Sequence, residues 1–347
     1  MQESNNNHSA HLLEVEHLKQ YFTVGGETIK GVDDVSFYVD KGEVFGLVGE
    51  SGCGKTTTGR AIIRLYDATS GNVYFNGQRI VAGTGDLREA LKAAKKEGDS
   101  AKVSRLKKEI AEAEYDHKHC KRDTITKIQM IFQDPIASLN PRMTVREIIS
   151  EGLVIRGVKD KDYINKKVIE VLDMVGLLPE HADRYPHEFS GGQRQRIGIA
   201  RSIVMEPDII IADEPISALD VSIQAQIINL INDLRKNMGL TILFIAHNLS
   251  VVKYFSDRIA VMYYGKIVES APSDELFAHP LHPYTRSLLS AIPLPDPHYE
   301  KTRQRITYTP ALDSDNSQEP EDREVSPGHI VRCTEKEFEK YIRELGV

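Results

Sequence analysis

The sequence has few cysteines, no excess of basic charge and no long hydrophobic run, and each of these shortages excludes a class of protein. Its three cysteines, Cys53, Cys120 and Cys333, lie far apart and form no Cys-x-x-Cys pair, which argues against a disulfide framework or a zinc ribbon. The formal net charge is −7, so the chain as a whole has no electrostatic footprint for nucleic acid. A local basic patch is still compatible with that total.

Membrane-spanning and secretory segments are also missing. The longest largely apolar run, Leu240 to Ala246, is far shorter than the ~18 residues that a membrane-spanning helix needs. The N-terminus has neither the basic start nor the apolar core of a secretory signal, which predicts that the protein stays in the cytoplasm. With 347 residues, the chain could form two domains or one large α/β domain with appendages.

The stretch VFGLVGESGCGKTTT, which begins at Val44, indicates a phosphate-binding loop. Its first five residues are apolar, which is typical of a strand buried on both faces of a parallel sheet, and a helix is expected from Lys55. The glycines between them allow the backbone N–H groups to turn inward at the positive end of the helix dipole. The spacing fits the P-loop, in which Lys55 reaches the terminal phosphates and the Thr56 hydroxyl binds Mg²⁺. The predicted nucleotide-binding residues of the loop are Gly49, Ser51, Gly52, Cys53, Gly54, Lys55, Thr56 and Thr57.

Short strands before and after the P-loop predict a small antiparallel sheet beside a parallel core. Val35 to Val39 alternates as a strand does, and Gly71 to Gly77 is a strand closed by a turn. Residues 86–122 are rich in Lys, Glu and Ala with apolar residues at helical spacing, and Gly98-Asp99 interrupts them, which predicts a helical hairpin. A solvated insertion is the plain interpretation, and a partner-docking arm is the alternative. The tract His117 to Cys120 within it is a weak metal candidate.

The rest of the chain is expected to be helical, then stranded, then irregular. Residues 140–178 have apolar residues spaced for one buried helical face, namely Ile164, Val168, Leu172 and Val175. Further strands are expected after Phe255. The tail beyond Tyr299 is predicted to be polar and irregular until an amphipathic helix near Glu335 to Leu345.

Three further apolar runs end in polar residues that suit phosphoryl transfer. One is followed by Asp213 and Glu214, the second by His247 and the third by Gln133. Because ligands bind outside the carboxyl ends of the strands of an open parallel sheet, these side chains and the P-loop are predicted to form one site.

Each of these side chains has a distinct role in the predicted chemistry, in which positioning and charge neutralisation dominate. Asp213 is expected to bind Mg²⁺ through water. Glu214 is placed to orient or deprotonate the attacking water, an effect worth ~10²–10⁴-fold. His247 can donate to the γ-phosphate, and Gln133 can reach both Mg²⁺ and the water. The predicted metal ligands are therefore Thr56, Gln133 and Asp213, and the predicted cofactors are ATP and Mg²⁺.

A second glycine pair lies in the stretch Ser190-Gly191-Gly192-Gln193, before a helix expected over Arg196 to Val204. An ordinary helix N-cap at Ser190 is the plain interpretation. A chain with one P-loop has no evident need of a second anion cradle, unless that cradle serves a nucleotide held by another subunit. The sequence therefore favours a dimer with ATP at its interface.

These motifs occur in the order and approximate spacing of the ATP-binding-cassette ATPases, and residues 12–270 resemble that family. The resemblance implies that Ser190 and Gly192 contact the γ-phosphate of ATP on the opposite subunit and that Asp220 lies at the dimer contact. It also implies that Tyr21 stacks on adenine, with Phe22 as the alternative. The signature begins with Phe189 where many members have leucine, a change that is expected to be tolerated. The nucleotide-contacting residues outside the P-loop are thus Tyr21, Ser190, Gly191, Gly192, Gln193 and Asp220.

The same resemblance implies the fold class and the domain limits. The fold is α/β, a P-loop NTPase core with a parallel sheet, an N-terminal antiparallel β subdomain, an α-helical signature subdomain, a helical hairpin insertion and a C-terminal extension. The ATPase domain covers 12–270, including the 86–122 insertion and a helical subdomain at about 140–200. The extension, of the type found in peptide transporters, covers 271–347.

Within the family, three stretches are similar to the oligopeptide, dipeptide and nickel branch of bacterial importers: Ala137 to Arg142, Ser217 to Ser222, and His282 to Thr285. This implies an ATP-hydrolysing subunit that powers import of oligopeptides or dipeptides, with nickel or another small solute as the alternative. Some members carry a C-terminal cysteine cluster, but Cys333 stands alone here, so no iron–sulfur centre is predicted.

The implied partners are a sister ATPase, with a heterodimer favoured over a homodimer, two transmembrane permease subunits and, indirectly, an extracellular solute-binding protein. The implied location is the cytoplasmic face of the cell membrane, and no nucleic acid is expected. A soluble cassette ATPase that acts on nucleic acid or ribosomes is the rival, and the single P-loop argues against it. A GTPase is disfavoured because no Asn-Lys-x-Asp motif is present.

Overall fold

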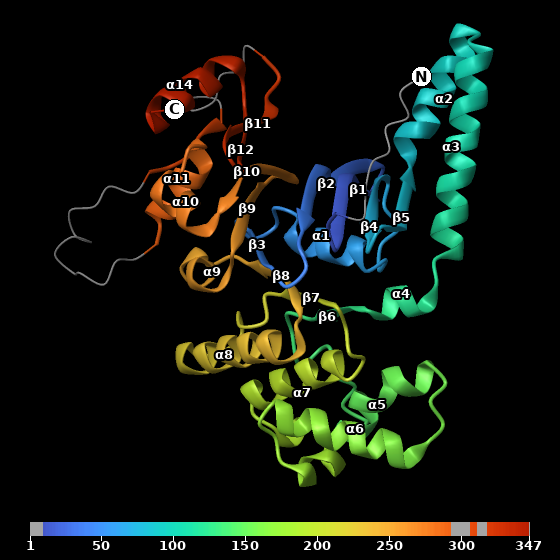
Figure 1. Cartoon of the computed structure of the whole chain (residues 1–347), viewed down its shortest axis with the longest axis vertical. Coiled ribbons are helices and arrows are strands. Elements are labelled where there is room, and N and C mark those ends of the chain that lie inside the picture. The colour runs from blue at the N-terminus through green and yellow to red at the C-terminus, as the bar shows by residue number, and fades with distance from the viewer. Residues whose placement is uncertain (1–9, 293–305, 311–317, 347) are drawn as a thin grey trace, which may run out of the picture. The chain divides into compact units, whose positions relative to one another are not determined.

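The computed structural model describes residues 10–292, 306–310 and 318–346 of the chain (Figure 1). The chain divides into two compact units. The first contains Met1–Tyr38, Val44–Lys118 and Ile245–Val347, and the second contains Val39–Glu43 and His119–Phe244. No helix in the described part of the chain combines the length and the apolar character that crossing a bilayer would require.

The first unit contains the predicted antiparallel sheet. Its strands are β1 (Leu13–Val24), β2 (Glu27–Val39), β4 (Ser70–Phe75) and β5 (Gln78–Thr84), in the order β2-β1-β4-β5. Asn76 and Gly77, both at positive φ, form the two-residue turn between β4 and β5, as an Asn-Gly hairpin requires. The strands expected near residues 35–39 and 71–77 are thereby confirmed.

The first unit also contributes strands in the order β11-β12-β10-β9-β3 to a second sheet. Strand β3 (Val44–Val48) is parallel to β9 (Arg258–Tyr263), whereas β10 (Lys266–Pro272), β12 (His329–Cys333) and β11 (Glu321–Ser326) add on antiparallel. The strands expected after Phe255 are confirmed. Among the helices of this unit are α1 (Lys55–Ile62), α9 (Leu249–Phe255), α10 (Ser273–Ala278) and α11 (Pro283–Ser290).

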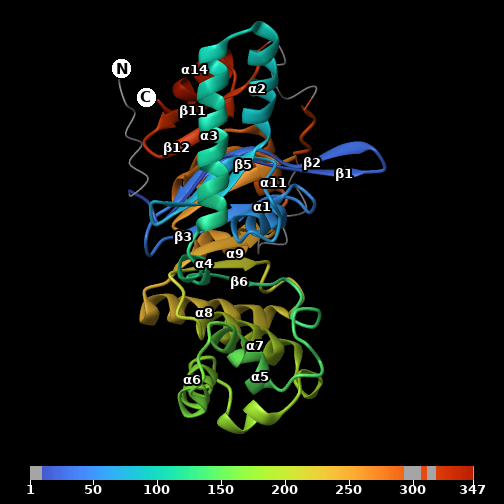
Figure 2. The same ribbon diagram turned by 90° about the vertical axis from the view of Figure 1, so that its right-hand side faces the viewer.

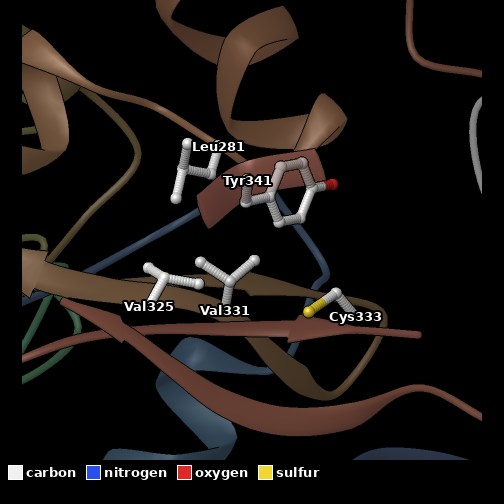
Figure 3. Close-up of a cluster of buried hydrophobic side chains, with 5 residues drawn as sticks. All are labelled: Leu281, Val325, Val331, Cys333 and Tyr341. Atoms are coloured by element: carbon white, nitrogen blue, oxygen red, sulfur yellow. The ribbon is translucent and has the colours of Figure 1, made fainter. Parts of the chain in front are cut away.

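The prediction of an irregular tail before the last helix was wrong, because β11 and β12 form a hairpin there. Strand β12 has one buried face, formed by His329, Val331 and Cys333, whereas β11 buries only Val325 and its many charged residues hide the strand in the sequence. The last helix, α14 (Glu335–Leu345), has the predicted bounds. Figure 3 shows the buried cluster that this part of the chain shares with the loop before α11, formed by Leu281, Val325, Val331, Cys333 and Tyr341.

The helical hairpin is confirmed as α2 (Gly85–Glu97) and α3 (Ser100–His119), which lie side by side in both views (Figures 1 and 2). Its base is tied to the antiparallel sheet, since Lys19 Nζ lies 2.7 Å from the Asp86 carboxylate and Arg79 bonds Asp116. Among the described residues, no group of three or more histidine, cysteine or acidic side chains could hold a metal ion, and the tract His117 to Cys120 belongs to none.

The second unit contains β8 (Thr241–Ala246, whose last two residues belong to the first unit), β7 (Ile209–Asp213) and β6 (Ile128–Ile131), in the order β8-β7-β6. Its helices are α4 (Arg122–Thr126), α5 (Val145–Ile155), α6 (Lys161–Met174), α7 (Gly191–Ile203) and α8 (Val221–Met238), with short 3₁₀ turns at Pro179–Asp183 and Pro186–Glu188. The predicted helical region is thus two helices separated by a loop. Val168, Leu172 and Val175 are buried as expected, and Ile164 is half-buried.

Candidate functional site

The P-loop connects the fully buried strand β3 to helix α1. Gly49, Gly52 and Gly54 have φ of +153°, +83° and +110°, in the region that favours glycine. A Cβ on Gly49 would overlap the carbonyl oxygen of Met262, and one on Gly54 would overlap that of Gly31. The loop therefore lies so close to neighbouring backbone that only glycine fits at these two positions.

Lys55 is the charged group of this loop. Its side chain is buried, with 3% of the residue exposed, and its Nζ donates to the carbonyl oxygens of Gly49 and Glu50, both at 2.8 Å. Nζ also lies 3.7 Å from Cys53 Sγ. Burial raises the pKa of the Cys53 thiol, and the Lys55 charge opposes that rise. An ammonium group and the N-terminus of α1 together make the loop attractive to an anion.

The other predicted P-loop residues differ in exposure. Ser51 and Gly52 are exposed, whereas Thr56 and Thr57 are half-buried in the first turn of α1. The Thr58 hydroxyl donates to the Gly54 carbonyl oxygen at 3.0 Å. Thr56 and Thr57, which precede it, are the two threonines predicted from the sequence to bind the nucleotide.

Tyr21, the residue expected to stack on adenine, has strong contacts within the first unit. Its hydroxyl donates to the Asp33 carboxylate, and Lys30 Nζ lies 5.3 Å from the centre of its ring. Burial and the Asp33 contact raise the pKa of the Tyr21 phenol. Tyr21 thus contacts both members of the ion pair between Lys30 and Asp33.

Phe22, the alternative aromatic, lies closer to the P-loop helix. A Cβ placed on Gly31 would be 3.0 Å from Phe22 Cε2 and 3.4 Å from Thr57 Cγ2, so both side chains approach the same point. The Phe22 ring also packs edge-on against Tyr66, with 5.3 Å between ring centres. The geometry therefore favours Phe22 over Tyr21 as the aromatic beside the P-loop.

In the second unit, the structure brings Gln133 and Glu214 together. Asp213 is fully buried at the end of β7, and Glu214 follows it with φ of +44°, a strained conformation for a glutamate. Gln133 Nε2 donates to Glu214 Oε2 at 3.0 Å, while the Ser217 hydroxyl donates to the Glu214 carbonyl oxygen at 3.1 Å. The glutamate is therefore fixed both at its side chain and at its backbone.

The Ser190 stretch starts helix α7, and the prediction that this helix begins at Arg196 was wrong by five residues. Ser190 is the N-cap: its hydroxyl accepts from the Gln193 N–H at 3.4 Å, and the Gln193 side chain accepts from the Ser190 N–H at 3.0 Å. This reciprocal capping box provides acceptors for backbone N–H groups at the start of the helix. Gly191 and Gly192 therefore form the first turn of the helix instead of preceding it.

Gly192 also allows a close approach to helix α8, because a Cβ at this position would be 2.7 Å from Ile223 Cγ2. A Cβ on Gly191 would be 3.5 Å from Leu219 Cδ2, an ordinary contact distance. Ser190 and Asp220, which occupy the N-cap positions of α7 and α8, are both exposed.

His247 follows β8 and is exposed in the first unit. It precedes α9, whose N-cap Asn248 accepts from the Ser250 N–H at 2.9 Å. His247 borders a pocket of about 270 Å³ that is also lined by Leu288 of α11. The prediction that the P-loop, Gln133, the Asp213–Glu214 pair and His247 form one site spans both units and stays a prediction.

Comparison with known proteins identifies the class to which this arrangement belongs. Residues 32–217 match the ABC transporter family, and residues 268–320 match the oligopeptide/dipeptide transporter C-terminal region. The chain therefore belongs to the ATPase subunits of the ABC transporter family, in the oligopeptide and dipeptide branch.

Relatives with similar sequences extend over almost the whole chain. The oligopeptide transport ATP-binding protein OppF of Bacillus subtilis is 56% identical over 332 residues, which cover 95% of this chain and 98% of OppF. The dipeptide transport ATP-binding protein DppF of Lactococcus lactis is 49% identical over 334 residues, which cover 95% of this chain and 96% of DppF. Among solved structures, a dimeric post-hydrolysis state of the ATP-binding cassette MJ0796 bound to ADP and Pi has a TM-score of 0.58 at 26% identity, and the match covers 75% of this chain and 98% of that one. The predicted α/β cassette fold with an N-terminal antiparallel subdomain is thereby confirmed.

Proposed function

We propose that this subunit binds and hydrolyses ATP to power the import of oligopeptides or dipeptides through a membrane ABC transporter. The P-loop carries this proposal, because its glycines and the buried Lys55 form a cradle that suits a triphosphate. The C-terminal region and the OppF and DppF relatives favour peptides over nickel as the transported solute.

Nucleotide binding is assigned to the P-loop and to Phe22. The N–H groups of the loop and Lys55 bind the phosphates, and Phe22 stacks on adenine in place of the predicted Tyr21. Thr56, Gln133 and Asp213 present hydroxyl, amide and carboxylate oxygens, the hard donors that Mg²⁺ prefers. Mg²⁺ held by these residues would supply positive charge to neutralise the phosphates of the nucleotide.

Hydrolysis is assigned to Glu214 as the group that orients and deprotonates the attacking water. Its hydrogen bond to Gln133 holds the carboxylate in one orientation, and its backbone strain is of the kind that accumulates at functional sites. His247 donates to the γ-phosphate. The rate depends on these groups because phosphoryl transfer is governed by positioning and charge neutralisation.

Assembly is assigned to the exposed helix starts of the second unit. Ser190, Gly191, Gly192 and Gln193, together with Asp220, face the ATP of a sister ATPase subunit, in a heterodimer. The pair serves two transmembrane permease subunits at the cytoplasmic face of the membrane, and an extracellular solute-binding protein delivers the peptide. The solvent exposure of Ser190 and Asp220 supports this arrangement.

The test uses the assembled transporter in lipid vesicles, with ATP hydrolysis, nucleotide binding and uptake of a labelled oligopeptide as readouts. Glu214→Gln should bind ATP with near wild-type affinity and hydrolyse it at least ~100-fold more slowly, because the general base is lost. Lys55→Ala should lose nucleotide binding.

The exposed Glu180 offers a matched control, since Glu180→Gln makes the same chemical change in the second unit away from Gln133. If Glu214→Gln hydrolyses ATP at the wild-type rate, Glu214 is not the group that activates the attacking water. Wild-type vesicles that hydrolyse ATP but take up no oligopeptide would overturn the assignment of the solute.

A further inference from the structure

The P-loop is contacted from outside by the C-terminal region of the chain. Tyr284, in helix α11, is buried with 2% of the residue exposed, and its hydroxyl oxygen accepts a hydrogen bond of 3.1 Å from the Glu50 N–H. Glu50 is the residue directly after Gly49 in the loop. A side chain 234 positions away therefore satisfies a backbone group of the phosphate cradle.

The backbone carbonyl group of Glu50 makes a second contact, with Lys55. The Glu50 carbonyl oxygen accepts from Lys55 Nζ at 2.8 Å, so one residue is held by Tyr284 at its N–H and holds the lysine at its carbonyl. A backbone N–H that is withdrawn from water needs an acceptor. Tyr284 supplies that acceptor and thereby fixes the peptide on which the Lys55 ammonium rests.

Two neighbours hold the Tyr284 ring. Tyr263, at the end of β9, lies 4.3 Å away between ring centres, and Tyr308 lies 5.7 Å away. The turn that follows Tyr263 also bonds the loop, since the Gly265 N–H donates to the Cys53 carbonyl oxygen at 2.9 Å. The P-loop is thus supported at two backbone positions by the part of the first unit that follows residue 245.

A buried polar network fixes the start of helix α11. His282 is its N-cap, and its Nδ1 accepts from the Tyr284 N–H at 3.1 Å. The fully buried Glu269 of β10 accepts from the N–H groups of Leu281 and His282 at 2.8 and 3.0 Å, and His329 Nε2 of β12 lies 2.8 Å from its carboxylate. A buried carboxylate is tolerated only when its oxygens are satisfied in this way. The network therefore connects the C-terminal hairpin to the residue that touches the P-loop.

We propose that Tyr284 is a positioning residue for ATP and that the C-terminal extension is a support of the P-loop. The inference rests on the proposed function, because it assumes that the loop binds the phosphates of ATP. Tyr284 touches no reacting atom; it acts through Glu50 and Lys55.

The test is Tyr284→Phe in the full chain, assembled with its partner subunits. This change keeps the ring packing and removes only the hydrogen-bond acceptor. One hydrogen bond of ordinary strength corresponds to about a three- to tenfold change in affinity. We expect the KM for ATP and the Kd for ATP to rise by that factor, with kcat within about twofold of wild type, as a loss of ground-state and transition-state binding alike requires.

Tyr341→Phe is the matched control. It removes the hydroxyl of another buried tyrosine of the extension, which belongs to the cluster in Figure 3 and has 3% of its surface exposed. We expect this variant to leave the KM and the Kd for ATP unchanged. An equal rise of the KM and the Kd for ATP in both variants would show that any destabilisation of the C-terminal extension weakens ATP binding. That result would overturn the positioning role of Tyr284.

Failure of the inference and failure of the proposed function give different results. If the wild type binds ATP, Lys55→Ala does not, and Tyr284→Phe binds as the wild type does, only the inference fails. If the wild type itself binds no ATP, the proposed function fails. A fall in kcat with an unchanged KM in Tyr284→Phe would also contradict the role assigned here.

Discussion

At the scale of single residues, neighbouring aromatic side chains of one strand have different partners. Tyr21 and Phe22 are consecutive in β1, so their side chains point to opposite faces of the sheet. Tyr21 bonds Asp33, whereas Phe22 approaches Thr57. Of the two, the phenylalanine approaches the first turn of α1, and it is the residue that we propose stacks on adenine.

Phe22→Ala should therefore weaken ATP binding by about ten- to a hundredfold, since base–aromatic stacking is worth about 1–3 kcal/mol. Tyr21→Ala removes the other ring together with the hydroxyl that bonds Asp33, and should leave ATP affinity within about twofold. Equilibrium binding of a fluorescent ATP analogue measures both. A larger loss in the tyrosine variant would reverse the assignment.

At the scale of elements, helix α11 has a histidine as its N-cap. Burial lowers the pKa of His282 to about 4, with Arg286 acting in the same direction and Glu269 and Glu337 against it. In the unfolded chain the imidazole has a pKa of about 6.5. Between pH 6.5 and pH 4, the unfolded state therefore binds a proton at His282 and the folded state does not. As a result, His282 lowers the free energy of unfolding as the pH falls from about 6.5 towards 4.

His282→Asn should remove this dependence while keeping the cap, because asparagine is a favoured N-cap residue. We expect the free energy of unfolding of the wild type to fall by about 2–3 kcal/mol more than that of the variant between pH 7 and pH 4.5. Urea unfolding at the two pH values measures the difference. Parallel losses in both proteins would contradict a neutral, buried His282.

At the scale of the whole molecule, the proposed assembly depends on helix starts that face a second subunit. Ser190 caps α7 and is exposed, so its cap and its proposed contact with the ATP of the partner can be separated by substitution. Aspartate is as good an N-cap as serine, but its charge repels a phosphate.

Ser190→Asp should preserve the free energy of unfolding and the ATP affinity of this subunit, and lower ATP hydrolysis by the assembled transporter at least about tenfold. Thr144→Asp is the control, since Thr144 forms an equivalent capping box at the start of α5. Hydrolysis that is unaffected by Ser190→Asp would place the ATP of the partner elsewhere.

Local patterns in the sequence predicted the elements that carry the site. The apolar run of β3, the glycine spacing of the P-loop and the break between α2 and α3 are each contained within a few residues. The strand and helix periods and the left-handed glycines are properties of the local backbone, so these features needed no knowledge of distant contacts. Capping is also local, and the capping box of Ser190 and Gln193 is a signal in the sequence that marks the true start of α7.

Only the tertiary structure decided which distant groups meet. The β11–β12 hairpin exists because β10 offers it a neighbouring strand, and its charged outer residues conceal that in the sequence. The bond from Glu50 to Tyr284 and the pair of Glu269 with His329 join residues 234 and 60 positions apart. A hydrogen bond depends on distance and direction in space, and neither is encoded in the separation of two residues along the chain.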